Sequence, residues 1–266
     1  FITLILVPFI GVEVKGSKRW LDIPFLPRFQ PVEILKPFFI IFISIILTLG
    51  KRNLYIKYIL STTILIPILL FLIYQPDLGQ TILLVMVWLA LIFVSGINIA
   101  LFFSFFISSG LAVSYLIFFV PKFEYIKIRI ISFIDNSAGS NYQADKASDA
   151  IINGGFFGKG IGEGTLNSKV PEAHTDYIVS VISEEFGAIF VIGIMIIYLI
   201  FSYKVFQKIN FIMDEKIKLI LIGSISIILL QSFIHVGVNI RLLPTTGMTL
   251  PFLSYGGSSI ISSSLI

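Results

Sequence analysis

The sequence predicts an all-α integral membrane protein, built as a polytopic helix bundle. Hydrophobic residues fill 56% of its 266 positions, charged residues fill only 13%, and the mean hydropathy is +0.99. Apolar runs that approach the roughly 20 residues needed to cross a bilayer recur along the chain. Because lipid offers the backbone no hydrogen-bond partners, we expect these runs to be helical.

Seven of these runs predict membrane-spanning helices, with a tolerance of a few residues for tilt. The predicted spans are Ile34–Gly50, Tyr58–Tyr74, Thr81–Ser95, Ala100–Val120, Phe186–Phe206, Lys218–Asn239 and a last one from about Thr249 onward. A leading run, Phe1–Gly11, is too short to span, and we interpret it as the tail of a truncated span. We expect residues 1–266 to form a single polytopic membrane domain belonging to a longer protein.

One long extramembrane region, residues 121–185, is rich in Gly, Ser, Asn and charge, so function is expected to concentrate there. Its first part, Phe123–Ile134, suits an interfacial amphipathic helix or a short strand. Tyr142–Ile152 has helical character. The glycine-rich segment Gly155–Gly164 does not match a phosphate-binding loop, so we favour a tightly turning loop that packs against the membrane surface.

Within this region, Pro171–Tyr177 and the following Glu184 and Glu185 gather four carboxylates and one of the two histidines. An unpaired charge in hydrocarbon costs several kcal/mol, so these groups must lie in water, in a protein cavity or against a polar substrate. We interpret the cluster as the candidate active site.

Composition also excludes several classes of function. The chain has no cysteine, which excludes disulfides, thiolate metal sites and a cysteine nucleophile. The net charge of +4 comes from cations in the loops between helices, where anionic lipid is the expected partner rather than nucleic acid.

Several segments at membrane–loop boundaries resemble the SEDS family, which includes FtsW, RodA and SpoVE. The matching segments, in order, are Gly16–Leu21, Gln30–Lys36, Gln75–Gly79, Gly154–Gly162, Pro171–Asp176, Glu184–Gly187 and Asn239–Ser258. The resemblance implies a ten-helix fold with the long loop outside the cytoplasm. It also implies a peptidoglycan glycosyltransferase that polymerises lipid II in the bacterial cytoplasmic membrane. Tyr142–Ala147 and Ala173 are more similar to the division branch, FtsW, than to RodA, which often has Arg at the position of Ala173.

The resemblance further implies lipid II and undecaprenyl-linked glycan as substrates, in a bilayer at the division septum. The expected partners are a class B penicillin-binding protein and other division proteins.

Chain elongation requires a base that removes a proton from a sugar hydroxyl while undecaprenyl pyrophosphate departs. Asp176 matches the family's essential aspartate, and we assign it as the candidate general base for the acceptor 4-hydroxyl. The structural alternative is a helix N-cap or first-turn acid at a helix starting near Tyr177. Similarity to the family also leaves open a divalent cation, Mg or Mn, bridging Asp176 and the pyrophosphate.

The remaining candidate residues would bind substrate. Lys18, Arg19 and Lys36 are candidates for gripping the pyrophosphate, although Glu33, three residues before Lys36, can pair with it instead. The other candidates are Asp77, which can equally be a turn cap, together with Glu172, His174, Thr175 and Arg241.

Other functions stay open at this point: a RodA-type elongation polymerase, a lipid II flippase, and a non-catalytic division scaffold. A flippase needs polar groups near the bilayer midplane. Nearly every charge in this chain instead lies at a helix end or in a loop, which favours surface chemistry.

Overall fold

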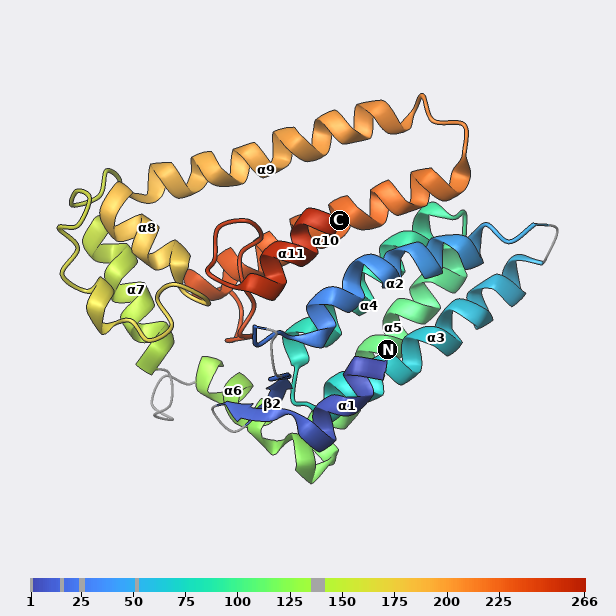
Figure 1. The fold of residues 1–266 in the computed structure, drawn as a ribbon, viewed down its shortest axis with the longest axis horizontal. Coiled ribbons are helices and arrows are strands. Elements are labelled where there is room, and N and C mark those ends of the chain that lie inside the picture. Colours follow the sequence, from blue (N-terminus) through green and yellow to red (C-terminus); the bar gives the residue numbers. More distant parts are fainter. Residues whose placement is uncertain (1, 15–16, 24–26, 51–52, 135–141) are drawn as a thin grey trace. The chain divides into compact units, whose positions relative to one another are not determined.

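The computed structural model describes residues 2–14, 17–23, 27–50, 53–134 and 142–266. Helices dominate the described part of the chain (Figure 1). In chain order the elements are α1 Ile2–Ile10, β1 Val12–Val14, β2 Ser17–Trp20, α2 Pro31–Leu47, α3 Leu54–Tyr74, α4 Leu78–Val94, α5 Ile99–Phe119, η1 Pro121–Phe123, α6 Glu124–Ile134, α7 Tyr142–Gly154, η3 Asn167–Lys169, α8 Ile178–Phe186, α9 Ala188–Ile209, α10 Glu215–Asn239 and α11 Gly257–Leu265.

Six of the predicted spans coincide with α2, α3, α4, α5, α9 and α10 to within a few residues. Among the described residues, α3, α5, α9 and α10 are long and apolar enough to cross a membrane, and α4 is a shorter apolar helix. The helical character predicted for Phe123–Ile134 and Tyr142–Ile152 is confirmed by α6 and α7.

The predicted start of the last span was wrong. Residues 243–250 are irregular, a turn follows, and α11 begins only at Gly257. Pro251 cannot donate a backbone hydrogen bond, and side chains of α10 bind the carbonyls of Met248 and Thr249. These contacts hold the apolar residues that follow Thr249 outside any helix.

Local sequence signals explain where several helices begin. Pro31 occupies the first turn of α2, where its missing N–H costs nothing. The side chain of Asn53 caps α3 by accepting a hydrogen bond from the amide of Tyr55, and Asp77 caps α4 in the same way through Gln80. Asp77 therefore has the capping role that was its structural alternative.

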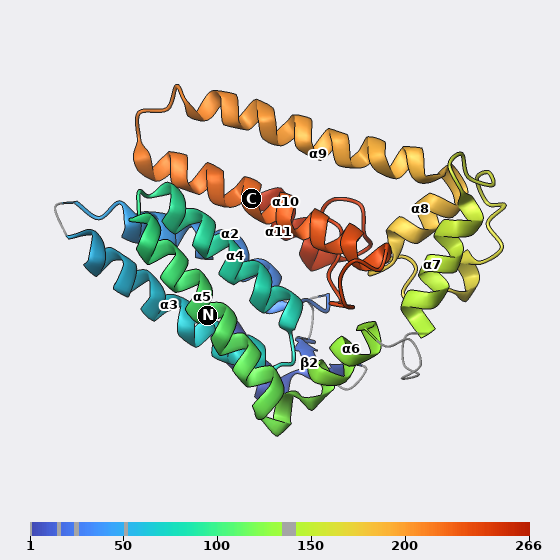
Figure 2. The ribbon, with the colours of Figure 1, turned by 180° about the vertical axis from the view of Figure 1, so that it is seen from behind.

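The chain divides into two compact units, and α5, α9 and α10 contribute residues to both. The first unit contains residues 1–107, 202–230 and 256–266. Its helices α2, α3 and α4 pack against one another, and α11 packs on α2 (Figures 1 and 2). Inside it, the indole of Trp88 on α4 donates a 3.1 Å hydrogen bond to the Ser61 hydroxyl on α3.

A short antiparallel hairpin, β1 and β2, lies before α2 in the first unit and was not predicted from the sequence. Leu21 and Phe29 extend it through an isolated bridge. The hairpin packs against α1.

The second unit contains residues 108–201 and 231–255. In it α7 packs against α8, and α8 contacts η3. α8 and α9 are separated at Gly187, whose φ of 86° lies in the left-handed region that favours glycine. This unit holds most of the long loop and the segment around Asp176.

Candidate active site

In the loop before α8, three consecutive backbone carbonyls, those of residues 174–176, accept hydrogen bonds that hold the candidate base in place. The carbonyl of His174 accepts a 2.8 Å hydrogen bond from the amide of Tyr255, and that of Thr175 accepts 2.7 Å from the Ser254 hydroxyl. The carbonyl of Asp176 accepts 3.1 Å from the side-chain amide of Asn239. Two elements distant in sequence, the end of α10 and the irregular segment after it, therefore place residues 174–176.

Asn239, the last residue of α10, is completely buried and uses both ends of its amide. Its nitrogen also donates to the carbonyl of His235, and its oxygen accepts a 3.2 Å bond from the amide of Ser180 in α8. Asn239 thus fastens the start of α8 to the end of α10.

The irregular segment is in turn bound to α10. Gln231 donates a 2.8 Å hydrogen bond to the carbonyl of Thr249, and the Nδ1 of buried His235 lies 2.7 Å from the carbonyl of Met248. The hydroxyl of Tyr198 on α9 donates to the carbonyl of Pro251. His235 therefore has the structural position expected of a core histidine, and the segment is a folded support for the Asp176 loop.

The side chains of the acidic loop have different surroundings. Asp176 is half-buried, whereas Glu172 and His174 are exposed. The Thr175 hydroxyl donates a 2.8 Å hydrogen bond to the Glu172 carboxylate within the loop. The N-cap of α8 is Tyr177, not Asp176, so the N-cap interpretation of Asp176 was wrong.

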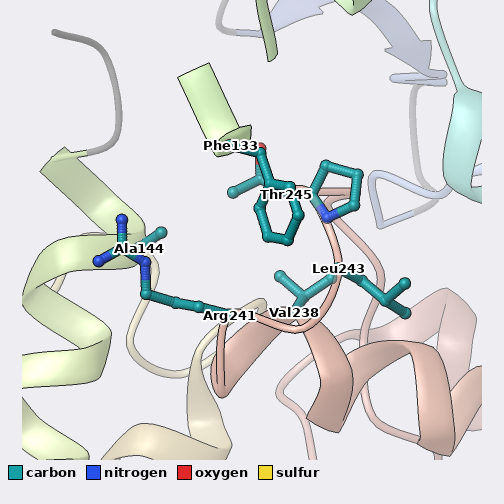
Figure 3. A pocket seen from close by; sticks show the side chains of 7 residues that line it. Phe133, Ala144, Val238, Arg241, Leu243 and Thr245 are labelled. Carbon is teal, nitrogen blue, oxygen red and sulfur yellow. The ribbon is translucent and has the colours of Figure 1, made fainter. Parts of the chain in front are cut away.

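The second unit also contains a small pocket. It is lined by Phe133, Ala144, Val238, Arg241, Leu243, Pro244 and Thr245. Figure 3 shows the Arg241 side chain reaching from the end of α10 towards α7, where Ala144 lies. There Arg241 forms a 2.8 Å ion pair with Asp145. In the chain, Val238 directly precedes Asn239 and Arg241 follows it by two residues.

Glu184 was grouped with the acidic cluster, but in the structure its carboxylate binds groups of the protein itself. Its side chain is fully buried, and its Oε1 accepts three hydrogen bonds of 2.9 Å. The donors are the Asn153 side chain and the backbone amides of Thr165 and Leu166. Glu184 thus ties the glycine-rich loop to α8.

The other predicted site residues belong to the first unit, where Arg19 and Asp77 hold the α3–α4 turn. Arg19 donates to the carbonyls of Gln75 and Pro76, and its guanidinium lies 3.8 Å from the Asp77 carboxylate. Gln30 donates a 2.8 Å bond to the same carboxylate. Burial raises the pKa of Asp77, and the nearby positive charge of Arg19 opposes this only in part.

Glu33 and Lys36 form a buried ion pair on α2. Their charged atoms are 2.8 Å apart, and Lys36 is completely enclosed. Gln80 from α4 donates a 2.6 Å hydrogen bond to the same Glu33 oxygen. The pairing that the sequence offered as an alternative to pyrophosphate binding is therefore present. Lys18, by contrast, is exposed on β2.

The ten predicted site residues thus fall into two groups of five. The first unit holds Lys18, Arg19, Glu33, Lys36 and Asp77, and the second holds Glu172, His174, Thr175, Asp176 and Arg241. Within the described ranges, no group of three or more His, Asp or Glu side chains is arranged to hold a metal ion. The cation site predicted from the sequence, in which the Asp176 carboxylate and substrate oxygens are the ligands, stays a prediction.

Sequence reasoning missed the supporting residues. Asn239 and Ser254 lie in segments that were noted for their resemblance to a family, but neither received a role. A signal was available, because a polar residue at the end of an apolar helix needs a hydrogen-bond partner. Gln30 and Gln80 carried the same signal beside Asp77 and Glu33.

Comparisons with known proteins identify relatives over the whole chain. The family model described as cell cycle protein, covering FtsW, RodA and SpoVE, matches residues 1–266. The probable peptidoglycan glycosyltransferase FtsW of Caulobacter vibrioides is 32% identical over 98% of this chain. The FtsW of Francisella salina, with the same description, is 36% identical over 97% of it. The chain spans 66% and 65% of the length of these two relatives.

Solved structures share the fold. A chain from work on the coordination of polymerization and crosslinking by a peptidoglycan synthase complex superposes with a TM-score of 0.81 and 25% identity. The match covers 99% of this chain and 75% of that one. The rod shape determining protein RodA of Thermus thermophilus superposes with a TM-score of 0.67 and 24% identity, over 98% and 70% of the two chains. The predicted helix-bundle fold is confirmed.

Proposed function

Because the chain belongs to the FtsW, RodA and SpoVE family of cell cycle proteins, we propose that its protein is a peptidoglycan glycosyltransferase. The enzyme polymerises lipid II into glycan strands during cell division. The description of the FtsW relatives as probable peptidoglycan glycosyltransferases supports this activity.

Asp176 is the general base. The acceptor 4-hydroxyl attacks the anomeric carbon of the donor sugar, the bond from that carbon to pyrophosphate breaks, and Asp176 takes the hydroxyl proton. Undecaprenyl pyrophosphate leaves with the bonding electrons. The observation that carries this role is the fixation of residues 174–176 by Asn239, Ser254 and Tyr255. A base held by fixed backbone loses little freedom when substrate binds.

Arg241 stabilises the charge that develops on the departing pyrophosphate. Arg241 lines the small pocket, and its guanidinium can form two parallel hydrogen bonds to phosphate oxygens. Its present partner, Asp145, is about half exposed, so a substrate phosphate can compete for the guanidinium at modest cost. Thr175, His174 and Glu172 contact the sugar or orient the loop. If the reaction uses Mg or Mn, Asp176 would hold the ion, which would offset negative charge on the pyrophosphate.

The first unit holds five further proposed contacts of the lipid-linked substrate: Lys18, Arg19, Lys36, Glu33 and Asp77. Lys18 is the member of this group that is already exposed. For the buried Glu33–Lys36 pair, substrate contact requires the ion pair to open, and its first role is to support α2.

The protein works in the bacterial cytoplasmic membrane at the division septum, with the long loop on the outer side. Its partners are a class B penicillin-binding protein and other division proteins. The likeness to a chain of a peptidoglycan synthase complex supports a crosslinking partner.

The decisive experiment is lipid II polymerisation by the full-length protein with its penicillin-binding partner. We expect Asp176→Asn to abolish polymer synthesis, whereas Asp149→Asn, which changes an exposed aspartate on α7, retains it. Polymer synthesis by the Asp176 variant at the wild-type rate excludes Asp176 as the base. Lipid II translocation by the wild type without any polymer supports a flippase instead.

A further inference from the structure

The tip of the glycine-rich loop exposes large apolar side chains. Phe156 is 72% exposed, Phe157 is 84% exposed and Ile161 is 78% exposed. We call residues 155–161 the glycine-loop tip. Adjacent exposed aromatic residues in an otherwise folded loop mark a surface that meets another apolar phase or a partner.

The glycine-loop tip is firmly attached to the rest of the second unit. The amides of Lys159 and Gly160 donate hydrogen bonds of 2.9 and 3.0 Å to the carbonyls of Glu184 and Glu185 at the end of α8. A Cβ added at Gly158 would lie 2.2 Å from the Glu185 carbonyl oxygen, so the close approach requires glycine. The exposed side chains therefore project from fixed backbone.

The same loop is bound to the first turn of α9. The amides of Ala188 and Ile189 donate hydrogen bonds of 3.0 and 3.3 Å to the carbonyls of Gly155 and Phe156. α9 is 22 residues long, and only 11% of its most apolar window is buried in the protein. Ile189 and Phe190, in its first turn, are about half exposed. The exposed, apolar start of α9 is therefore joined directly to the backbone of Phe156.

We propose that the glycine-loop tip inserts into the bilayer leaflet on its own side of the membrane and anchors the long loop there. Phe156, Phe157 and Ile161 extend the lipid-facing surface of α9 into the interfacial zone, where apolar burial is favourable. Exposed Lys159, between them in the sequence, binds lipid phosphate. The proposal rests on α9 as a membrane span and not on the proposed catalytic activity.

The continuity with α9 favours lipid over a protein partner as the occupant. The tip shares backbone hydrogen bonds with a helix whose side chains already require an apolar solvent, so a bilayer around α9 reaches the tip without any further assembly. A partner protein would cover the tip only after a complex forms.

The absence of cysteine from these 266 residues makes a direct test practical. Phe157→Cys and Ile161→Cys, each carrying an environment-sensitive fluorophore, are placed in full-length protein in nanodiscs of phosphatidylethanolamine and phosphatidylglycerol. Glu163→Cys, at an exposed position two residues beyond the tip, is the matched control. Gel filtration and thermal unfolding of each labelled protein verify that it is folded.

We expect blue-shifted emission at positions 157 and 161, and severalfold stronger quenching by lipids spin-labelled near the headgroup than at position 163. Quenching at 157 and 161 that equals the control overturns the proposal. Shielding that arises only when the penicillin-binding partner is added also overturns it, and identifies the tip as a protein contact. Wild-type protein that makes no polymer from lipid II, with the expected quenching at positions 157 and 161, contradicts the proposed function but leaves the anchor intact.

Discussion

The side-chain amide of Asn239 lies 3.1 Å from the carbonyl oxygen of Asp176 and donates a hydrogen bond to it. This contact joins the end of one long apolar helix to the residue assigned as the base. It explains why an asparagine is buried at this position, and it leads to the first prediction.

Replacing Asn239 with Ala should lower both stability and polymer synthesis. The substitution removes the bonds to Asp176, His235 and Ser180, and each buried partner left without a bond costs about 1–3 kcal/mol. Thermal unfolding in detergent and lipid II polymerisation measure the two effects. Asn210→Ala, at an exposed position, should change neither. Wild-type activity in a folded Asn239 variant would show that Asp176 is positioned by other contacts.

Replacing Lys36 with Met should cost about 3–5 kcal/mol, because the Glu33 charge is then buried without its partner. The double variant Glu33→Gln, Lys36→Met should recover most of this loss. SDS titration of each folded protein in mild detergent measures its free energy of unfolding. Lys218→Met is a matched control, since Lys218 pairs with Glu215 at the same spacing but in a more exposed setting.

This pair of variants also separates structure from function. If Lys36 contacts the pyrophosphate, the stable double variant will polymerise poorly. A stable double variant with normal activity contradicts a role for Lys36 in substrate binding.

Glu184→Ala should destabilise the long loop by about 3 kcal/mol, since the amides of Thr165 and Leu166 lose their acceptor. Glu184→Gln should cost far less, because one carboxamide oxygen can still accept these bonds. Limited proteolysis of the loop and thermal unfolding provide the comparison. Equal losses for the two variants would show that the negative charge, rather than the acceptor geometry, matters.

Two glycine-to-alanine substitutions in the loop should lower the free energy of unfolding by different amounts. Gly162→Ala places a Cβ in open space at a φ of 75° and should cost about 1–2 kcal/mol from backbone strain alone. Gly158→Ala adds a collision with the Glu185 carbonyl at a φ of 80° and should cost about 3 kcal/mol or more. Unfolding midpoints measure the difference. Similar losses of stability in the two variants would mean that the backbone around Gly158 shifts to accommodate the added Cβ.

Asp77 should make stability depend on pH. Because burial raises its pKa in the folded protein, the folded state holds this proton more tightly than the unfolded chain does. The resulting stabilisation is present below the unfolded pKa and is lost as pH rises through the folded pKa. Asp77→Asn, which keeps a good N-cap, should remove this loss. Unfolding temperatures of the two proteins from about pH 4 to about pH 8 give the comparison. If the unfolding temperatures of the wild type and the Asp77 variant differ by the same amount at every pH, the raised pKa of Asp77 is contradicted.

The sequence predicted the long helices well because their lengths follow from the thickness of hydrocarbon. It predicted the surroundings of the charged residues poorly. Asp176 and Glu184 were read as one acidic cluster, yet Glu184 is turned inward to bind backbone amides while Asp176 is half-buried beside the end of α10. Only tertiary hydrogen bonds distinguish the two, and these depend on chain segments far apart in the sequence.

The same limit explains the misplaced final helix. The composition of residues 249–256 resembles the start of a span, but Ser254 and the amide of Tyr255 bond to Thr175 and His174. Partners some 80 positions earlier in the chain thereby replace the helical bonds. A hydropathy pattern carries no information about such partners.

A helix ordinarily leaves its first four amides to be hydrated, which discourages a membrane span from beginning out of reach of water. In α9 the first two amides are instead taken up by carbonyls of Gly155 and Phe156. The span can therefore start below the hydrated zone, with about 33 Å of helix to traverse the hydrocarbon. The start of α9 is bonded to the glycine-rich loop and not to water. A tilt of α9 or a thinning of the bilayer will therefore move the attached loop together with the helix.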